Sequence, residues 1–133
     1  MLDISELNFI SILLAAVVKF IVGGLWFSKV LFGDLWLKET NQKMEELGSP
    51  RNAMIIGFAL CLLVSFSFAV LMQMLALDLR SSIAIAVIVA IGITSAQTGL
   101  SFAFEGRSLK LFLIYATQCV AEFVVVVLIL KLM

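Results

Sequence analysis

Two ionisable residues of opposite charge, Lys19 and Glu122, stand inside long uncharged stretches of the chain. A charge at the centre of a bilayer costs about 3 kcal/mol on insertion scales, so such residues face a bundle interior or a cavity and pair with another polar group. If the first helix runs inward and the last outward, a rise of about 1.5 Å per residue separates the two by about 5 Å in depth. We therefore expect them to pair, or to share one polar cavity, with their helices adjacent within a subunit or across a subunit boundary.

Two interpretations of this pair remain open. One is a structural lock that orients helices, because buried ion pairs are often retained without adding stability. The other is a path for an ion, a proton or a solute, because ionisable residues inside membranes commonly mark one. Four further polar side chains would line such a path: Tyr115, Gln118, Thr94 and Gln97. No span contains an internal proline, so the broken helices that many transporters use are not indicated.

Other chemistry is poorly represented in the sequence. The chain has no His and shows no phosphate-binding glycine loop, zinc pattern or nucleophile motif. Cys61 and Cys119 are far from C-x-x-C spacing, which favours buried thiols over a disulfide. The zero formal net charge gives no basic surface for nucleic acid. We expect no metal, cofactor or nucleic-acid partner and no enzyme activity; an enzyme would have to use the turn at Glu105 or the ion pair.

The elements that must position these residues are membrane-spanning helices. Hydrophobic residues make up 63% of the 133-residue chain and charged residues 14%, against about 45–50% and about 25% in soluble domains. A spanning helix needs about 20 mostly apolar residues, and barrel strands would alternate in polarity instead. Four stretches qualify: about residues 8–27, 52–76, 83–104 and 109–130. The sequence thus predicts an all-α polytopic membrane protein, a four-transmembrane-helix bundle forming one domain over residues 1–133.

The first span is predicted to stay in the mature protein. A signal peptide begins with basic residues and ends at a small-residue cleavage site. This chain instead begins with Asp3 and Glu6, and its first stretch is followed by the bulky pair Trp26 and Phe27.

The long connection after the first span carries a helical pattern over about residues 34–47. Four residues recur on one side at helical spacing: Trp36, Thr40, Met44 and Leu47. This pattern predicts a short interfacial helix lying on the membrane surface, the alternative being a solvated helical connector. Gly48 suits its end, Ser49 suits a helix N-cap, and Pro50 suits the first turn of the second span.

The second span carries a stripe of small residues at every fourth position: Gly57, Cys61, Ser65 and Ala69. Small residues let membrane helices approach closely, so we expect a helix-packing seam. A chain this small buries little of its own surface, and such a seam could also join copies. The favoured function is therefore a structural or assembly bundle that forms homo-oligomers; the alternative is a channel or transporter subunit whose polar path involves Lys19 and Glu122.

The orientation follows from the basic residues in short loops, which collect on the cytoplasmic side. Six lie in the connections after the first and third spans: Lys29, Lys38, Lys43, Arg51, Arg107 and Lys110. Only Arg80 and Lys131 lie on the other side. We expect the long connection to be cytoplasmic and both termini to lie outside.

Two blocks of the chain resemble a known family. They are FIVGGLWFSKVLFGDLW from Phe20 to Trp36, with the pair Asn8-Phe9 before it, and FEGRSLKLFLIYA from Phe104 to Ala116. Both are similar to the uncharacterised membrane family catalogued as domain of unknown function 1761, which usually has proline at Lys29 and often asparagine at Tyr115. The resemblance implies a four-span protein of the bacterial cytoplasmic (inner) membrane, surrounded by lipid, with no established activity.

The first block also has a physical interpretation of its own. Its aromatic residues are typical of an interfacial belt at the membrane surface: Trp26, Phe27, Phe32 and Trp36. Gly33 would allow the turn at which the chain lies down on the membrane.

Overall fold

The computed structural model describes residues 2–43, 48 and 50–133. Within these ranges the chain is helical with no strand, and four helices are long and apolar enough to cross a membrane. They are α1 (Phe9–Trp26), α3 (Pro50–Met74), a composite third helix (Leu79–Glu105) and α6 (Leu109–Leu132). The predicted fold class, all-α with four potential spans, is confirmed.

Short polar side chains begin three of these helices. Asn8, Asp78 and Ser108 each accept a hydrogen bond from a backbone N–H in the first turn of α1, the third helix and α6. This satisfies a donor that has no partner inside the helix. Gly106 ends the third helix with φ of 70°, a left-handed conformation that glycine adopts without strain.

The third helix is not a regular α-helix throughout. It consists of α4 (Leu79–Ile88), a π-helical segment (Val89–Ser95) and α5 (Ala96–Glu105). It also begins at Leu79, four residues before the predicted span, because Asp78 caps it. π-Helical turns are rare and occur frequently at functional sites.

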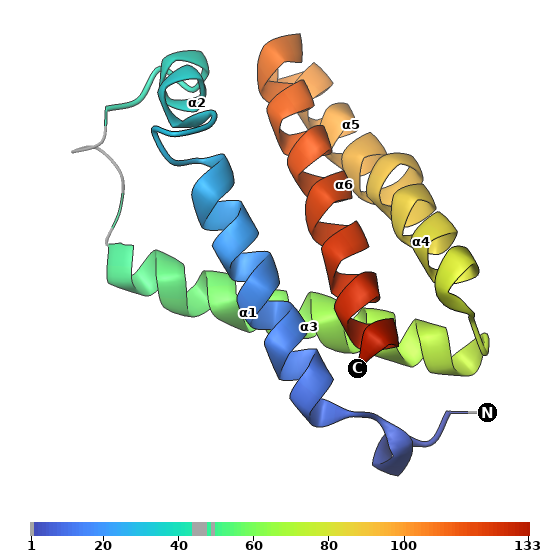
Figure 1. Cartoon of the computed structure of the whole chain (residues 1–133). Coiled ribbons are helices and arrows are strands. Elements are labelled where there is room, and N and C mark those ends of the chain that lie inside the picture. The colour runs from blue at the N-terminus through green and yellow to red at the C-terminus, as the bar shows by residue number, and fades with distance from the viewer. Residues whose placement is uncertain (1, 44–47, 49) are drawn as a thin grey trace.

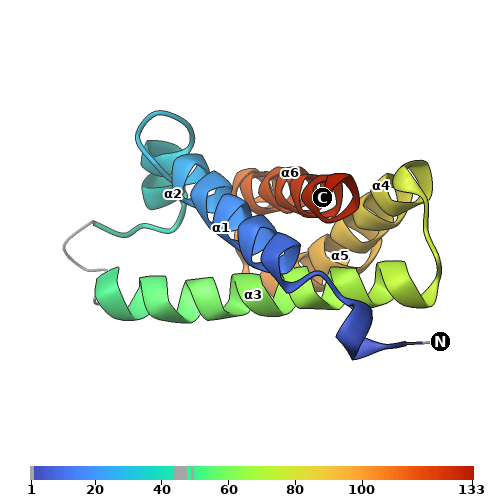
Figure 2. The same ribbon diagram turned by 60° about the horizontal axis from the view of Figure 1, so that its bottom comes forward.

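The helices do not form a parallel bundle (Figure 1). α6 lies centrally, in contact with α1 on one side and with α4 and the π-helical segment on another. In Figure 1, α3 runs across α1 and α6 instead of alongside them, and Figure 2 shows α1 lying obliquely to α3. Among the described residues α3 packs mainly on α1 and makes at most slight contact with the third helix.

The apolar core lies at the end of the molecule that holds the α3–α4 connection and the C-terminus, called here the terminal end (Figure 1). Its buried members come from α1, α3, α4, the π-helical segment and α6: Ala15, Phe68, Ala86, Ala90, Cys119, Phe123, Val126 and Val127. The opposite end, which holds α2 (Gly33–Glu39) and the start of α6, is called the loop end.

The interfacial helix is shorter than predicted. It was expected over residues 34–47, but α2 ends at Glu39. Thr40 bonds back to the Trp36 carbonyl, and Asn41 then adopts a positive φ of 55°. Asparagine visits this left-handed region more readily than other non-glycine residues, and the helix stops there. The predicted positions Met44, Leu47 and Ser49 lie outside the described residues.

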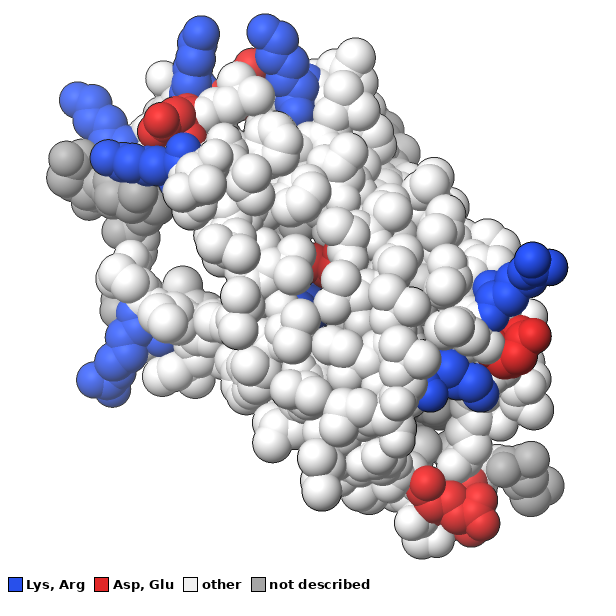
Figure 3. All heavy atoms as spheres, viewed as in Figure 1, with Lys and Arg blue, Asp and Glu red and all other residues white. Residues whose placement is uncertain are grey.

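Charged side chains gather at the two ends of the molecule (Figure 3). A broad uncharged band separates them, and one small red and one small blue spot show through it. Large apolar side chains with half or more of their surface exposed are frequent on the helices: Ile10, Leu13, Ile21, Ile55, Ile56, Leu60, Leu63, Ile88, Ile91, Ile93 and Leu113. This distribution fits a band of lipid contact between two polar surfaces.

Candidate intramembrane polar site

The ion pair lies between α1 and α6. The Lys19 Nζ atom is 2.9 Å from the Glu122 Oε2 atom, and only 12% and 4% of the two side chains are exposed. The pairing that the sequence predicts is therefore present, and it forms within a single chain. The two helices are in extensive contact, so the pair is held by the packing of α1 on α6.

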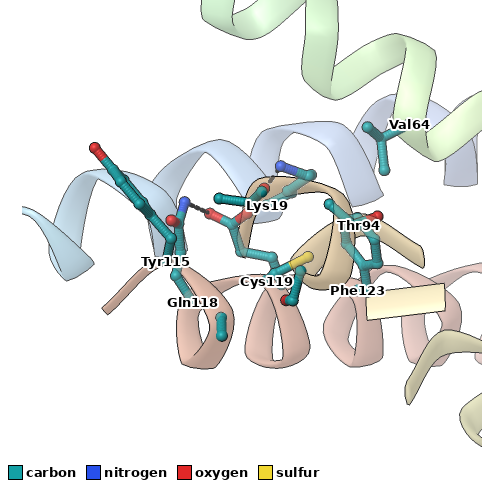
Figure 4. Close-up of a pocket in the computed structure, with 11 residues that line it drawn as sticks. Lys19, Val64, Thr94, Tyr115, Gln118, Cys119 and Phe123 are labelled. Carbon is teal, nitrogen blue, oxygen red and sulfur yellow. Dashed lines mark hydrogen bonds and ion pairs between the residues drawn. The ribbon is translucent and has the colours of Figure 1, made fainter. Parts of the chain in front are cut away.

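The Glu122 carboxylate has a hydrogen bond at each oxygen. Lys19 donates to Oε2, and the Gln118 Nε2 atom, one turn earlier on α6, donates to Oε1 at 2.9 Å. Figure 4 shows both interactions as dashed lines. These two hydrogen bonds offset part of the cost of burying the carboxylate.

Gly23 makes room for this carboxylate. A Cβ atom at Gly23 would lie 2.6 Å from Glu122 Oε1, closer than real Cβ contacts allow. The glycine lies one helical turn after Lys19 on α1, so the same face supplies both the ammonium and the space for its partner.

Lys19 also contacts two less polar groups. Its Nζ atom lies 3.8 Å from the Cys61 sulfur on α3 and 6.0 Å from the centroid of the Phe123 ring. The ring face attracts a cation electrostatically, which adds a modest stabilisation to the ammonium. The pair is thus surrounded by residues from α1, α3 and α6.

A cavity of about 420 Å³, called here the polar cavity, borders the ion pair. Its lining comes from four helices, and Figure 4 shows these residues: Lys19, Val64, Thr94, Ser95, Thr98, Tyr115, Ala116, Gln118, Cys119, Glu122 and Phe123. A second cavity of about 310 Å³ borders the pair from the α1–α3 side, lined in part by Gly23, Gly57 and Cys61. The two charges therefore have open space on two sides.

The third helix contributes three hydroxyl groups to the polar cavity: Thr94, Ser95 and Thr98. Thr94 and Ser95 are the last two residues of the π-helical segment. The i→i+5 pairing of a π-helix adds a residue to the turn and so rotates the next residues relative to the apolar face before it. The segment spans the boundary between an apolar run, residues 83–93, and the hydroxyl-bearing residues that follow it.

The sequence anticipated most of the lining but not all of it. Lys19, Glu122, Gln118, Tyr115 and Thr94 lie together around the cavity, whereas Gln97 is exposed and outside the lining. The lining stripe is Thr94, Ser95 and Thr98, which leaves Gln97 on the neighbouring face of the helix. Ser95 and Thr98 were missed as site residues, although Thr98 stands four residues after Thr94, which is the spacing that places two side chains on one helical face.

The small-residue stripe of α3 is used inside the chain. The Ser65 hydroxyl donates to the Ile12 carbonyl at 2.7 Å, Cys61 meets Lys19, and a Cβ at Gly57 would lie 3.5 Å from the Phe20 ring. Ala69, further along, is half-buried. Three of the four residues of the stripe therefore lie against α1 within the chain: Gly57, Cys61 and Ser65.

The aromatic residues of the predicted interfacial belt pack on one another and on α6. The Trp26 Nε1 atom donates to the Ile114 carbonyl at 3.1 Å, and the Trp36 Nε1 atom donates to the Tyr115 hydroxyl at 3.0 Å. Ring centroids lie 5.4 Å apart for Trp26 and Phe32, 5.0 Å for Phe27 and Trp36, and 5.6 Å for Phe27 and Tyr115. We call these five residues the aromatic cluster.

A close approach of two backbone segments supports the cluster. A Cβ at Gly33 would lie 2.5 Å from the Phe27 carbonyl oxygen, and the Gly33 N–H donates to Ser28 at 2.8 Å. The turn predicted at Gly33 is present, and the glycine is needed for space.

Tyr115 lies between the polar cavity and a second pocket at the loop end. It lines that cavity and also a polar pocket of about 390 Å³ at the loop end, to which Glu39, Thr40, Arg107 and Ser108 contribute. Toward the terminal end, the side chains of the apolar core pack beyond Phe123. The polar cavity therefore meets the loop-end pocket at Tyr115 and borders the apolar core on its other side.

Comparison with known proteins adds one finding. A family model described as "Protein of unknown function (DUF1761)" matches residues 10–131, a range that includes the ion pair, the polar cavity and the aromatic cluster. No curated protein and no solved structure matches the chain.

Proposed function

Because the chain belongs to the DUF1761 family, whose description names no activity, we propose its function from the geometry of the site. It is a membrane transport protein, or one subunit of a channel or transporter, whose substrate passes the Lys19–Glu122 pair. On this proposal the protein is a transporter, and neither an enzyme nor a purely structural bundle.

The polar cavity is the observation that carries this proposal. An ion pair that only locks two helices needs its hydrogen-bond partners but no free volume beside it. Here about 420 Å³ of space lies against the pair, lined by three hydroxyl groups and the Gln118 amide. A cavity of this size with several polar partners is roomy enough for water or a small solute.

The position of Tyr115 supports a path that opens to water at the loop end. Tyr115 lines both the polar cavity and the polar surface pocket, and the Trp36 indole holds its hydroxyl. Movement of this side chain away from Trp36 and Phe27 would join the two spaces. Beyond Phe123 the buried residues of α6 in the core are Val126 and Val127, so among the described residues no polar side chain of the core continues the path toward the terminal end.

The proposed setting is the cytoplasmic membrane of a bacterium, with the loop end in the cytoplasm and both termini outside. The excess of Lys and Arg in the connections at the loop end supports this orientation. Tyr115 then lies on the cytoplasmic side of the polar cavity.

Water access to Cys119 tests the proposal. Cys119 lines the polar cavity and is 9% exposed, and Cys61 is the chain's other cysteine. In a Cys61→Ala variant, a charged, membrane-impermeant methanethiosulfonate is applied to the cytoplasmic face of inverted membrane vesicles. Because this reagent needs a thiolate and water, we expect Cys119 to react, and to react about tenfold faster when Tyr115→Ala is added.

The matched control is the Cys61→Ala/Cys119→Ala variant, which should show no modification. If Cys119 stays unmodified in the folded protein with and without Tyr115→Ala, yet reacts fully after denaturation, the cavity is closed to water. A structural role for the ion pair would then replace transport.

A further inference from the structure

One polar group on the wall of the polar cavity is left unsatisfied. The Ser95 hydroxyl is buried, with the residue 4% exposed, and it is the one such side-chain atom among the described residues that has no hydrogen-bond partner. The Cys119 thiol beside it is only a weak hydrogen-bonding group. Buried hydroxyls are nearly always paired, so an unpaired one on a cavity wall indicates a ligand or water.

The polar cavity continues into an apolar groove. A further cavity of about 300 Å³ shares Val64, Thr94 and Phe123 with it, and Figure 4 shows these three residues at the end opposite Tyr115. The rest of its lining is apolar apart from one serine: Leu63, Ser67, Phe68, Leu71 and Val89. We call this space the apolar groove.

The apolar groove opens at the outer surface of the uncharged band. It lies between α3 and the third helix, which are in slight contact at most among the described residues. Leu63 and Leu71 on its rim are 59% and 37% exposed. In a membrane this opening meets acyl chains and not water.

The charges already satisfy one another. Glu122 receives hydrogen bonds from Lys19 and Gln118, so the pair together carries no net charge. A ligand with a formal charge would leave the site with an unbalanced charge in a medium of low dielectric constant. The groups that remain to bind a ligand are the uncharged Ser95 hydroxyl and the apolar groove beside it.

We propose that the site binds an amphiphile taken from the bilayer: a hydrocarbon chain that ends in an uncharged hydroxyl or carbonyl head. The head bonds to Ser95 in the polar cavity, and the chain lies in the apolar groove between α3 and the third helix. This inference rests on the proposed transport function, because it names the substrate class of the same site.

A photoactivatable cetyl alcohol, with its reactive group near the hydroxyl, tests the inference in liposomes that contain the full chain. We expect saturable crosslinks to peptides that contain Ser95 or Phe123, competed by unlabelled cetyl alcohol but not by hexadecane or glycerol. Ser95→Ala should weaken the apparent affinity about fivefold, the effect of losing one neutral hydrogen bond.

Two further variants complete the design. Ser82→Ala is the matched control, because Ser82 is a buried serine of the same helix whose hydroxyl is bonded to Asp78 and lies outside the cavities described; it should leave labelling unchanged. Val89→Phe fills the apolar groove and should reduce labelling about tenfold while Cys119 still reacts with the water-soluble reagent.

The outcomes separate this inference from the proposed function. Labelling that is insensitive to both Ser95→Ala and Val89→Phe overturns the inference, and so does competition by glycerol as strong as that by cetyl alcohol, which would indicate a solute from water. An unreactive Cys119 overturns transport; if specific labelling survives in that case, the site binds a bilayer amphiphile without an aqueous path.

Discussion

At the scale of single residues, the site depends on a balance between one ammonium and one carboxylate. Lys19 and Gln118 each donate to one oxygen of Glu122, and Gly23 leaves the space for the second oxygen. Removing one member leaves the other charge buried without its partner, which costs far more than the pair contributes when intact.

Lys19→Met should therefore lower the free energy of unfolding by about 3 kcal/mol. The double variant Lys19→Met/Glu122→Leu should recover most of that loss, because two apolar side chains of similar size leave no unpaired charge in the buried site. Unfolding in mixed micelles of rising denaturing-detergent content measures both. Glu105→Gln, which breaks the exposed pair with Arg107, is the matched control and should cost less than about 1 kcal/mol. A Lys19→Met loss no larger than this control would contradict the account.

Adjacent glycines give a second test. Gly23→Ala forces a Cβ against the Glu122 carboxylate and should cost about 1–3 kcal/mol, as overpacking does. Gly24→Ala meets nothing within 4 Å and should be neutral or stabilising by up to about 1 kcal/mol, because alanine favours a helix. Thermal unfolding in detergent compares them; equal stability of the two variants would show that Gly23 is not needed for space.

The sequence was sufficient to identify Lys19 and Glu122 as partners, because a charge in an apolar stretch has few alternatives. It could not reveal the role of Gly23, which depends on the register of α1 against α6. Ser95 was also missed, because a serine in an apolar stretch looks like an ordinary small residue until its neighbours are known.

At the scale of elements, local sequence signals predict where the helices begin. They do not predict where a helix becomes irregular or ends early. The caps at Asn8, Asp78 and Ser108 are readable as short polar residues before apolar runs. The π-helical segment Val89–Ser95, which packs against α6, has no such signal in the sequence. The end of α2 depends on the positive φ of Asn41, which cannot be predicted from the apolar pattern of residues 34–47.

The cap of the third helix is expected to respond to pH. Hydrogen bonds from Ser81, first from its side chain and then from its backbone, hold the pKa of Asp78 below its usual range. The stabilisation by this cap is therefore complete above the unfolded-state pKa of about 4 and is lost as the pH falls through the lower folded-state pKa. Asparagine caps a helix without titrating.

Unfolding temperatures measured from neutral to strongly acidic pH check this expectation. The wild type should lose more stability than Asp78→Asn below about pH 4, since other carboxyl groups titrate equally in both. Identical curves for the two proteins would mean that Asp78 does not supply the acid-sensitive contact.

At the scale of the whole molecule, three features combine: an uncharged band, charged surfaces at both ends, and one buried ion pair beside a cavity in between. Composition alone predicted the band and the four helices. The oblique path of α3 was not predictable from it, because helix length and hydropathy do not determine tilt, which packing against neighbours sets. That path opens the gap between α3 and the third helix, and with it the apolar groove.

The central claim is that a charged pair borders a water-accessible cavity. Solid-state NMR of the protein in lipid bilayers tests it most directly. The sample carries isotope labels in the glutamate side-chain carboxyls and the lysine side-chain nitrogens. The account predicts an ionised carboxyl signal in close dipolar contact with a lysine nitrogen, receiving magnetisation from water protons and disappearing in Glu122→Gln. A Glu122 carboxyl that is protonated, or that shows neither the lysine contact nor the transfer from water, would contradict it.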